Sequence, residues 1–201
     1  MIPLAVVAIA YILGAIPFGF LLVKFTTGRD VRASGSGNIG ATNVLRTSGR
    51  AAGVATLLLD IGKGYLAVWI ASRLSEHDPL WMSVAALAVM AGHAYPVFLK
   101  LKGGKAVASC VGAFLFLTPV AMAATLVVFI AAVAWTRYIS MGSVIASATL
   151  PLAVWLLSKP TLPPLLAAIL AGGFVIYKHS SNIERLRLGT EHVFRFGAPT
   201  Q

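Results

Sequence analysis

The sequence predicts an all-α protein: a polytopic bundle of about seven membrane-spanning helices, forming a single transmembrane domain over residues 1–201. Hydrophobic residues make up 58% of the chain and charged residues only 11%, whereas soluble domains carry about a quarter charged residues. The apolar segments are long and lack the alternation of a half-buried strand. Because backbone polar groups need internal partners in lipid, such segments form helices or a closed barrel, and this pattern favours helices.

The apolar segments follow one another along the chain with short polar connections. The expected spans cover about residues 3–25, 51–74, 80–99, 140–157 and 165–177. Between the third and fourth of these, the apolar stretch 106–135 is interrupted by Thr118 and Pro119. It forms either one kinked span or two short ones, and each half is shorter than the roughly 17–25 residues of a usual span.

The distribution of charge favours two crossings of the stretch 106–135, as a hairpin that turns at Pro119. Nearly all basic residues between spans then lie on one side of the membrane, which the positive-inside rule makes cytoplasmic. The charged residues on the other side are Arg73, Glu76, Asp78 and Lys159. A single crossing would move Arg137 and the C-terminal segment outside and remove this asymmetry. We therefore expect the N-terminus outside and the C-terminus in the cytoplasm, although one or two spans could be re-entrant or interfacial.

The net charge of +10 also bears on the partners of the protein. Its basic residues lie in short loops beside apolar segments, where they meet anionic lipid headgroups. The lipid bilayer is therefore the expected partner, and nucleic acid is not.

Three polar segments, residues 36–46, 92–105 and 179–191, are rich in groups that bind phosphate. In the first, Gly37 and Gly40 precede a helical segment, so backbone N–H groups and a helix N-terminus can face an anion. Asn43 and Arg46 are three residues apart and share a helix face, and Arg46 offers a bidentate fork. An ordinary interhelical loop with a basic flank is the alternative.

The second polar segment contains Gly103, Gly104 and Lys105 at the start of the apolar stretch 106–135. Two unencumbered amides and an ammonium group at a helix start suit an anion. Lysines near a membrane surface also serve as headgroup anchors. His93, at the end of the third span, is a candidate ligand or a core residue.

The third polar segment places His179 and Asn182 three residues apart, so both can face one ligand. Histidine is the natural general base near neutral pH. Glu191 can pair with Arg185 or Arg187 and hold the C-terminal tail. The alternative is an interfacial helix with a solvated polar side.

One acidic and one basic residue lie inside the second span. Asp60 and Lys63 are three residues apart, and charges at that depth are costly, so they should face the bundle interior and pair. A substrate contact for Lys63 is the alternative. Cys110, the only cysteine, is expected to be a small buried hydrophobe.

Taken together, the three polar segments resemble the motifs of the PlsY family, the bacterial membrane acyl-phosphate:glycerol-3-phosphate acyltransferases. Residues 36–46 match Ser-Gly-x-x-Gly-x-x-Asn-x-x-Arg. Residues 92–98 match Gly-His-x-x-Pro-x-Phe and are followed by Gly-Gly-Lys, and residues 179–191 match His-x-x-Asn-Ile-x-Arg-Leu-x-x-Gly-x-Glu. The resemblance covers essentially the whole chain. Leu101 departs from the aromatic residue that the family often has there, but keeps an apolar side chain.

The resemblance implies transfer of a fatty acyl group from acyl phosphate to the sn-1 hydroxyl of glycerol 3-phosphate. The products would be lysophosphatidic acid and phosphate, in the first committed step of bacterial phospholipid synthesis. It further implies no cofactor and no metal, a location in the bacterial cytoplasmic (inner) membrane with the active site facing the cytoplasm, and a functional link to the soluble enzyme that makes acyl phosphate.

The resemblance also implies roles for individual residues. The expected catalytic residues are Ser36, His179 and Asn182. The expected substrate-binding residues are Gly37, Gly40, Asn43, Arg46, His93, Gly103, Gly104 and Lys105. Arg185 and Glu191 would be structural, near the site. His179 would orient the attacking hydroxyl or take its proton, unless the phosphate of the substrate does so. The three polar segments should meet in one pocket.

Two other functions compete with this interpretation. A transporter for organic phosphates would also need basic groups in a helical bundle, but would place them near the midplane and often has internal repeats. A metal-dependent phospholipid-headgroup transferase would need acidic ligands. Asp30, Asp60 and Asp78 have no spacing that forms a ligand cluster.

Overall fold

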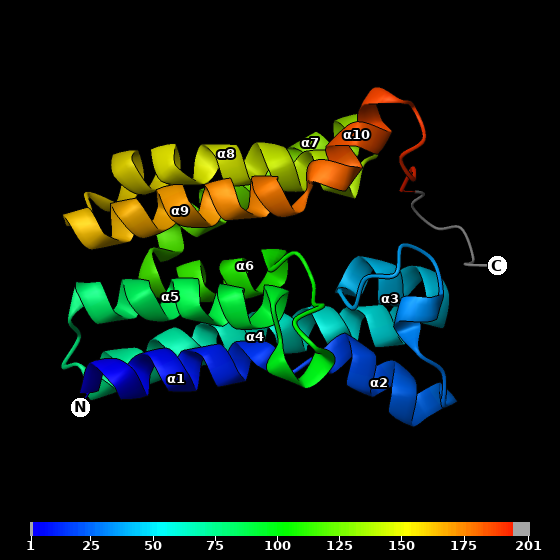
Figure 1. The fold of residues 1–201 in the computed structure, drawn as a ribbon. Coiled ribbons are helices and arrows are strands. Elements are labelled where there is room, and N and C mark those ends of the chain that lie inside the picture. Colours follow the sequence, from blue (N-terminus) through cyan, green and yellow to red (C-terminus); the bar gives the residue numbers. More distant parts are fainter. Residues whose placement is uncertain (1, 195–201) are drawn as a thin grey trace. The chain divides into compact units, whose positions relative to one another are not determined.

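The computed structural model describes residues 2–194, and within them every regular element is a helix. The chain forms two compact units, one within residues 2–116 and the other within residues 117–194. Figure 1 shows the helices of each unit.

The first unit is built from six α-helices and two short 3-10 helices. They are α1 (Ile2–Ala15), α2 (Phe18–Thr27), η1 (Val31–Ala33), α3 (Ala41–Ser48), α4 (Arg50–Leu74), α5 (Pro79–Ala94), η2 (Val97–Leu99) and α6 (Val107–Leu117). Helix α1 packs against α4 and α5, and α2 and α3 both pack against α4. The N-terminal apolar segment, expected as one span, is thus two helices that break at Ile16 and Pro17 (Figure 1). The break follows from proline, which cannot donate a backbone hydrogen bond within a helix.

The second unit contains α7 (Pro119–Thr136), α8 (Ile139–Ser158), α9 (Leu162–Lys178) and α10 (Ser180–Arg187). Helix α8 packs against both α7 and α9, and α10 contacts α8 and α9. A bend of 54° separates α9 from α10. The expected interruption at Thr118 and Pro119 is confirmed, because α6 ends at Leu117 and α7 begins at Pro119.

Several helical segments of the described residues are long and apolar enough to cross a membrane. The five candidates are Leu4–Thr27, Arg50–Leu74, Pro79–Leu99, Pro119–Thr136 and Ile139–Ser158, and the bent pair α9 and α10 makes a sixth if it counts as one span. Helix α6 has 11 residues, about 16 Å at 1.5 Å per residue, roughly half the thickness of the hydrocarbon core. The structure therefore supports an all-helical, multi-pass architecture. The expected seven spans require that the bent pair counts as one span and that the short helix α6 also crosses the membrane.

Glycines allow the helices of the first unit to pack closely. A Cβ atom at Gly14 or Gly92 would overlap a backbone carbonyl across the α1–α5 contact, and one at Gly64 or Gly112 would do so across the α4–α6 contact. Helices in lipid associate through such small residues, because lipid tails provide no hydrophobic drive for helices to associate.

Candidate active site

The loop that leads into the first polar segment begins with a local ion pair. Asp30 accepts a hydrogen bond from the Arg32 backbone N–H at 2.9 Å, and its Oδ2 lies 2.7 Å from the Arg32 guanidinium. The side-chain hydrogen bonds from Arg32 lower the pKa of Asp30 to about 2. The loop then turns through Gly35 and Gly37, whose φ angles of 62° and 70° lie in the left-handed region that glycine adopts at little cost.

Asn43 holds this loop together from within. Its side chain is 2% exposed, and its Oδ1 accepts a hydrogen bond from the Ser36 N–H at 2.8 Å. Its Nδ2 donates to the carbonyls of Val31, Ser34 and Asn38 at 3.2, 3.2 and 2.8 Å. The sequence led us to expect a substrate contact from Asn43. In the structure its amide group bonds to the loop backbone, and a substrate contact from Asn43 stays a prediction.

The other expected residues of the first segment lie around this loop. Ser36 lies before α3 and is exposed, whereas Arg46 lies on α3 and is partly exposed. Gly40 is the residue that caps the start of α3, and its N–H donates to Asn38 Oδ1 at 2.8 Å. The helix N-terminus that the sequence predicted is therefore present at residues 40–41.

The second polar segment folds over His93. The His93 side chain is only 4% exposed, and its backbone carbonyl accepts a hydrogen bond from the Gly104 N–H at 3.0 Å. A Cβ atom at Gly104 would overlap His93 Nε2, and one at Gly103 would overlap the His93 carbonyl and the Pro96 ring. His93 therefore lies beneath the loop as a support, and the Gly104 N–H is engaged within the protein. Contacts of His93 and Gly104 with substrate stay predictions.

An apolar cluster joins the first two polar segments. It is formed by Val23, Val31, Ile39, Val44 and Leu99. Ile39 and Val44 lie within the first segment and Val31 precedes it, whereas Leu99 lies within the second segment. The first unit therefore packs backbone of the first segment, through Ile39 and Val44, against Leu99 of the second.

Asp60 and Lys63 form the buried pair that the sequence predicted within α4. The Lys63 Nζ lies 2.8 Å from Asp60 Oδ1 and donates to the Ile16 carbonyl at 2.8 Å. That carbonyl belongs to the break between α1 and α2, where the helical bonding pattern is interrupted.

The third polar segment lies at the bend between α9 and α10. His179 is the residue between the two helices and is 4% exposed. Its Nδ1 lies 2.7 Å from the Val175 carbonyl. Because a carbonyl only accepts, Nδ1 carries the hydrogen, and the neutral ring has its basic lone pair on Nε2.

Glu191 organises the rest of this segment. Its Oε1 accepts from Asn182 Nδ2 at 2.7 Å and from the Ser140 hydroxyl at 3.0 Å. Its Oε2 accepts from Arg185 Nε at 2.8 Å, so Arg185 is the partner that the structure selects over Arg187. Burial disfavours the ionised carboxylate, but the hydrogen bonds from Asn182, Arg185 and Ser140 outweigh it and lower the pKa of Glu191.

Ser140 had no role in the sequence interpretation. It lies near the start of α8 and is 6% exposed. Nothing in the local sequence marks it, since its partner is 51 residues away. That the third segment joins the other two in one pocket stays a prediction.

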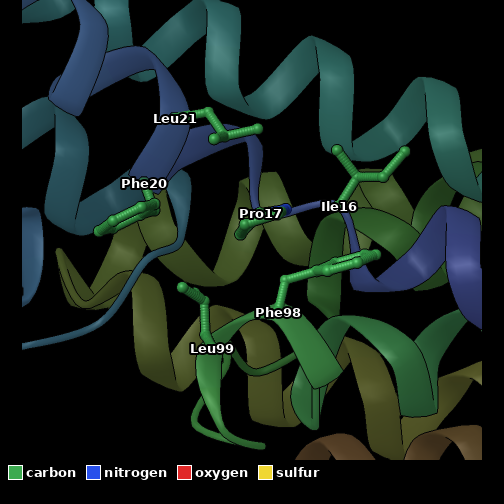
Figure 2. A pocket seen from close by; sticks show the side chains of 6 residues that line it. All are labelled: Ile16, Pro17, Phe20, Leu21, Phe98 and Leu99. Atoms are coloured by element: carbon green, nitrogen blue, oxygen red, sulfur yellow. The ribbon is translucent and has the colours of Figure 1, made fainter.

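An apolar groove of about 370 Å³ opens beside the break between α1 and α2. Figure 2 shows its lining, to which the break and α2 contribute one side and η2 the other. The lining residues are Ile16, Pro17, Phe20, Leu21, Phe98 and Leu99. Leu99 also belongs to the apolar cluster that joins the first two polar segments, so the groove and that cluster share this residue.

Known proteins resemble this chain over nearly its full length. The glycerol-3-phosphate acyltransferase family model matches residues 4–189. The glycerol-3-phosphate acyltransferase of Geobacter sulfurreducens is 48% identical over 192 residues, covering 96% of this chain and 97% of that protein. The corresponding protein of Geobacter metallireducens is 49% identical over 196 residues, covering 97% of this chain and 99% of that protein.

Two crystal structures of PlsY, an integral membrane glycerol 3-phosphate acyltransferase, are similar in fold. The glycerol 3-phosphate form matches with a TM-score of 0.91 at 38% identity, covering 96% of each chain. The lysophosphatidic acid form matches with a TM-score of 0.88 at 36% identity, covering 96% of this chain and 95% of that one. With matches of this extent in sequence and in fold, this multi-pass membrane protein belongs to the glycerol-3-phosphate acyltransferase family.

Proposed function

We propose that the protein transfers a fatty acyl group from acyl phosphate to the sn-1 hydroxyl of glycerol 3-phosphate. The observation that carries the proposal is the packing of two phosphate-suited segments on one apolar cluster in the first unit. The similar PlsY structures, obtained in glycerol 3-phosphate and lysophosphatidic acid forms, support the acceptor and the product. Acyl phosphate would come from a soluble enzyme that makes it.

The reaction needs positioning more than a covalent catalyst. The acceptor hydroxyl oxygen attacks the acyl carbonyl carbon, the bond from that carbon to the phosphate oxygen breaks, and phosphate leaves with the electron pair. The proton of the hydroxyl passes to a base. Because phosphate is already a good leaving group, the protein must mainly hold two anions together and stabilise the carbonyl oxygen as it becomes negative.

In this proposal the three polar segments supply different chemistry. Arg46 and Lys105 hold the phosphate of the acceptor. Ser36 and the backbone amides of the first polar segment hold the acyl phosphate. His179 takes the proton on Nε2 or orients the hydroxyl while the substrate phosphate takes it. Asn182, whose Nδ2 donates to Glu191 Oε1 at 2.7 Å, orients the acyl phosphate. The acyl chain lies in the apolar groove between α2 and η2.

A donor-substitution assay tests the reaction itself. Purified protein receives radiolabelled glycerol 3-phosphate with palmitoyl phosphate, palmitoyl-CoA or palmitoyl-acyl carrier protein. We expect product only with palmitoyl phosphate, and a product acylated at the sn-1 position by mass spectrometry. Turnover with either thioester, or acylation at the other hydroxyl, would refute the proposed chemistry. A parallel flux assay in proteoliposomes separates it from a phosphate transporter.

A pair of lysine variants tests the acceptor site. Loss of a charge-assisted contact at Lys105 costs about 1.5–3 kcal/mol, which is roughly a 10- to 150-fold rise in KM for glycerol 3-phosphate. Lys102, exposed in the same connection, is the matched control, and Lys102→Ala should leave KM unchanged. Equal effects of the two variants would indicate a general loss of surface charge instead of a specific contact.

A pair of substitutions in the third segment tests the base. His179→Ala should lower kcat by about 10²–10⁴-fold if His179 takes the proton, and less if the substrate phosphate does. Asn182→Ala should lower kcat with the protein still folded in the membrane. Rates near those of the wild type would remove both residues from the site.

We also propose seven spans, with the N-terminus outside the cytoplasmic membrane and the polar segments facing the cytoplasm. Cysteine labelling tests this, because the native Cys110 is buried. Cysteines at the exposed positions Ser36, Lys102 and Glu184 should resist a membrane-impermeant maleimide in intact cells, whereas one at Glu76 should react. Labelling of any of the first three from outside would overturn the orientation.

A further inference from the structure

A buried ionic cluster includes the histidine that contacts Gly103 and Gly104, and the proposed chemistry uses none of its side chains. It consists of Asp60 and Lys63 on α4 and His93 on α5, whose side chains are 3–4% exposed. Two charges at this depth carry a desolvation penalty that their attraction does not reliably repay. A contribution to stability is therefore a weak explanation for the presence of the cluster.

Lys63 has a structural partner outside the cluster. Its Nζ donates to the Ile16 carbonyl at 2.8 Å and lies 5.6 Å from the centre of the Phe18 ring. Ile16 lies in the break between α1 and α2, and Phe18 is the first residue of α2. Lys63 therefore holds the two helix ends, and Asp60 provides the opposite charge.

Asp60 also faces the histidine that supports the loop. The Nδ1 atom of His93 lies 3.6 Å from Asp60 Oδ1 and 3.3 Å from the Ser109 hydroxyl. The other edge of the same ring, at Nε2, presses against Gly104 so closely that a Cβ atom there would overlap it. The imidazole thus fills the space between Asp60 and the loop.

The backbone of the Gly103–Lys105 loop depends on this support. The Gly104 N–H donates to the His93 carbonyl. Ala106, one residue after Lys105, is buried and has a φ of 60°. A residue other than glycine in the left-handed region is strained and persists only where its surroundings hold it. A shift of the His93 ring would therefore move the backbone that carries Lys105.

We propose that Asp60 is a positioning residue that fixes the Gly103–Lys105 loop through His93, so that the loop is preorganised for the phosphate of the acceptor. The inference rests on the proposed role of that loop in holding glycerol 3-phosphate. Asp60 does not touch the substrate. It acts by fixing the rotation of the imidazole, and so the position of the loop amides and the Lys105 backbone.

The first test replaces Asp60 with an isosteric neutral residue. At saturating acyl phosphate, Asp60→Asn should raise KM for glycerol 3-phosphate by about tenfold and change kcat by less than about threefold, because acceptor binding is weakened and the chemical step is not. An unchanged KM would overturn the inference.

A double substitution separates positioning from mere charge balance. Asp60→Asn with Lys63→Met leaves no unpaired charge in the cluster, so thermal stability should recover toward that of the wild type. If Asp60 only neutralises Lys63, KM recovers as well, which would overturn the inference. If Asp60 positions His93, KM stays raised. The double variant also carries the test if Asp60→Asn alone does not fold.

A second cycle asks whether the effect passes through His93. In a His93→Gln background, Asp60→Asn should raise KM no further, because the link to the loop is already cut. Full additivity would refute the route through His93. Lys105→Ala serves as the reference for the proposed function. If it leaves KM unchanged, the acceptor role of the loop is wrong, whereas a raised KM for Lys105→Ala with an unchanged KM for Asp60→Asn contradicts the positioning role alone.

Discussion

Replacing Asn43 with aspartate should unfold the first polar segment, whereas the same change at Asn38 should not. The two side chains face opposite kinds of backbone group. Asn43 Nδ2 donates to three carbonyls, whereas Asn38 Oδ1 accepts from the Gly40 N–H at 2.8 Å. Aspartate has no N–H to donate and two oxygens that accept, so it reverses the first interaction and preserves the second.

The magnitude follows from the contacts of Asn43. Its NH₂ group has two hydrogens shared among three carbonyls, and its Oδ1 holds one N–H. The Val31 carbonyl keeps the Ser34 N–H at 3.4 Å and the Ser34 carbonyl keeps the Gly37 N–H at 3.1 Å, so each of the three lost bonds counts for about 1 kcal/mol. Loss of the donors therefore costs the loop about 3 kcal/mol, and a carboxylate facing carbonyls adds repulsion. Asn38→Asp instead places a negative charge near the start of α3, which is favourable by about 0.3–1 kcal/mol.

Hydrogen exchange measured by mass spectrometry, in detergent micelles, is the appropriate assay. Protection of amides within residues 31–43 should fall by about 100-fold or more in Asn43→Asp, since 1.36 kcal/mol corresponds to a factor of ten. Protection should be unchanged or slightly higher in Asn38→Asp. Equal protection in the two variants, together with a raised KM for Asn43→Asp alone, would show that Asn43 contacts substrate and that our structural reasoning is wrong.

Glu191→Gln should destabilise the protein by about 1–2 kcal/mol at pH 7, because an NH₂ group replaces one of two accepting oxygens. Since the pKa of Glu191 is lowered in the folded state, the wild-type advantage is full above the ordinary pKa near 4.5 and disappears as the pH falls through the folded value. Melting curves at pH 7 and below 4 check this, and a constant difference would contradict it. Gly104→Ala should lower kcat/KM for glycerol 3-phosphate at least tenfold through overlap with His93, whereas Gly62→Ala, where a Cβ meets nothing within 4 Å, should not. Leu21→Trp should fill part of the groove of about 370 Å³ and slow long-chain donors while sparing short ones; equal slowing of both would place the acyl chain elsewhere.

Some elements were predictable because one dominant force sets them. The second span was expected over residues 51–74 and forms Arg50–Leu74, and another was expected over 140–157 and forms Ile139–Ser158. Because lipid offers no hydrogen-bond partners, the backbone of an apolar segment must bond internally, and the length of the segment sets the length of the helix. The interruption at Pro119 was predictable for the same local reason, the missing N–H of proline.

The roles of individual polar side chains were less predictable. Asn43 and His93 occupy motif positions where we expected substrate contacts, and the structure adds that both are buried and contact the loops that carry the motifs. Whether an amide faces a ligand or a backbone carbonyl depends on how the chain turns through Gly35 and Gly37, which no spacing rule gives. Motif patterns select residues that a site needs, and supporting residues are among them.

The sequence by itself determined the membrane class, the helices and the three phosphate-suited segments, because hydrophobicity and local backbone chemistry act over a few residues. The tertiary structure decided what spacing cannot encode: Ser140 bonded to Glu191, Lys63 to the Ile16 carbonyl, and His93 wedged between Asp60 and Gly104. These contacts join residues far apart in the chain. They exist only where helix packing brings a donor within about 3 Å of an acceptor, and that distance is a property of the folded molecule.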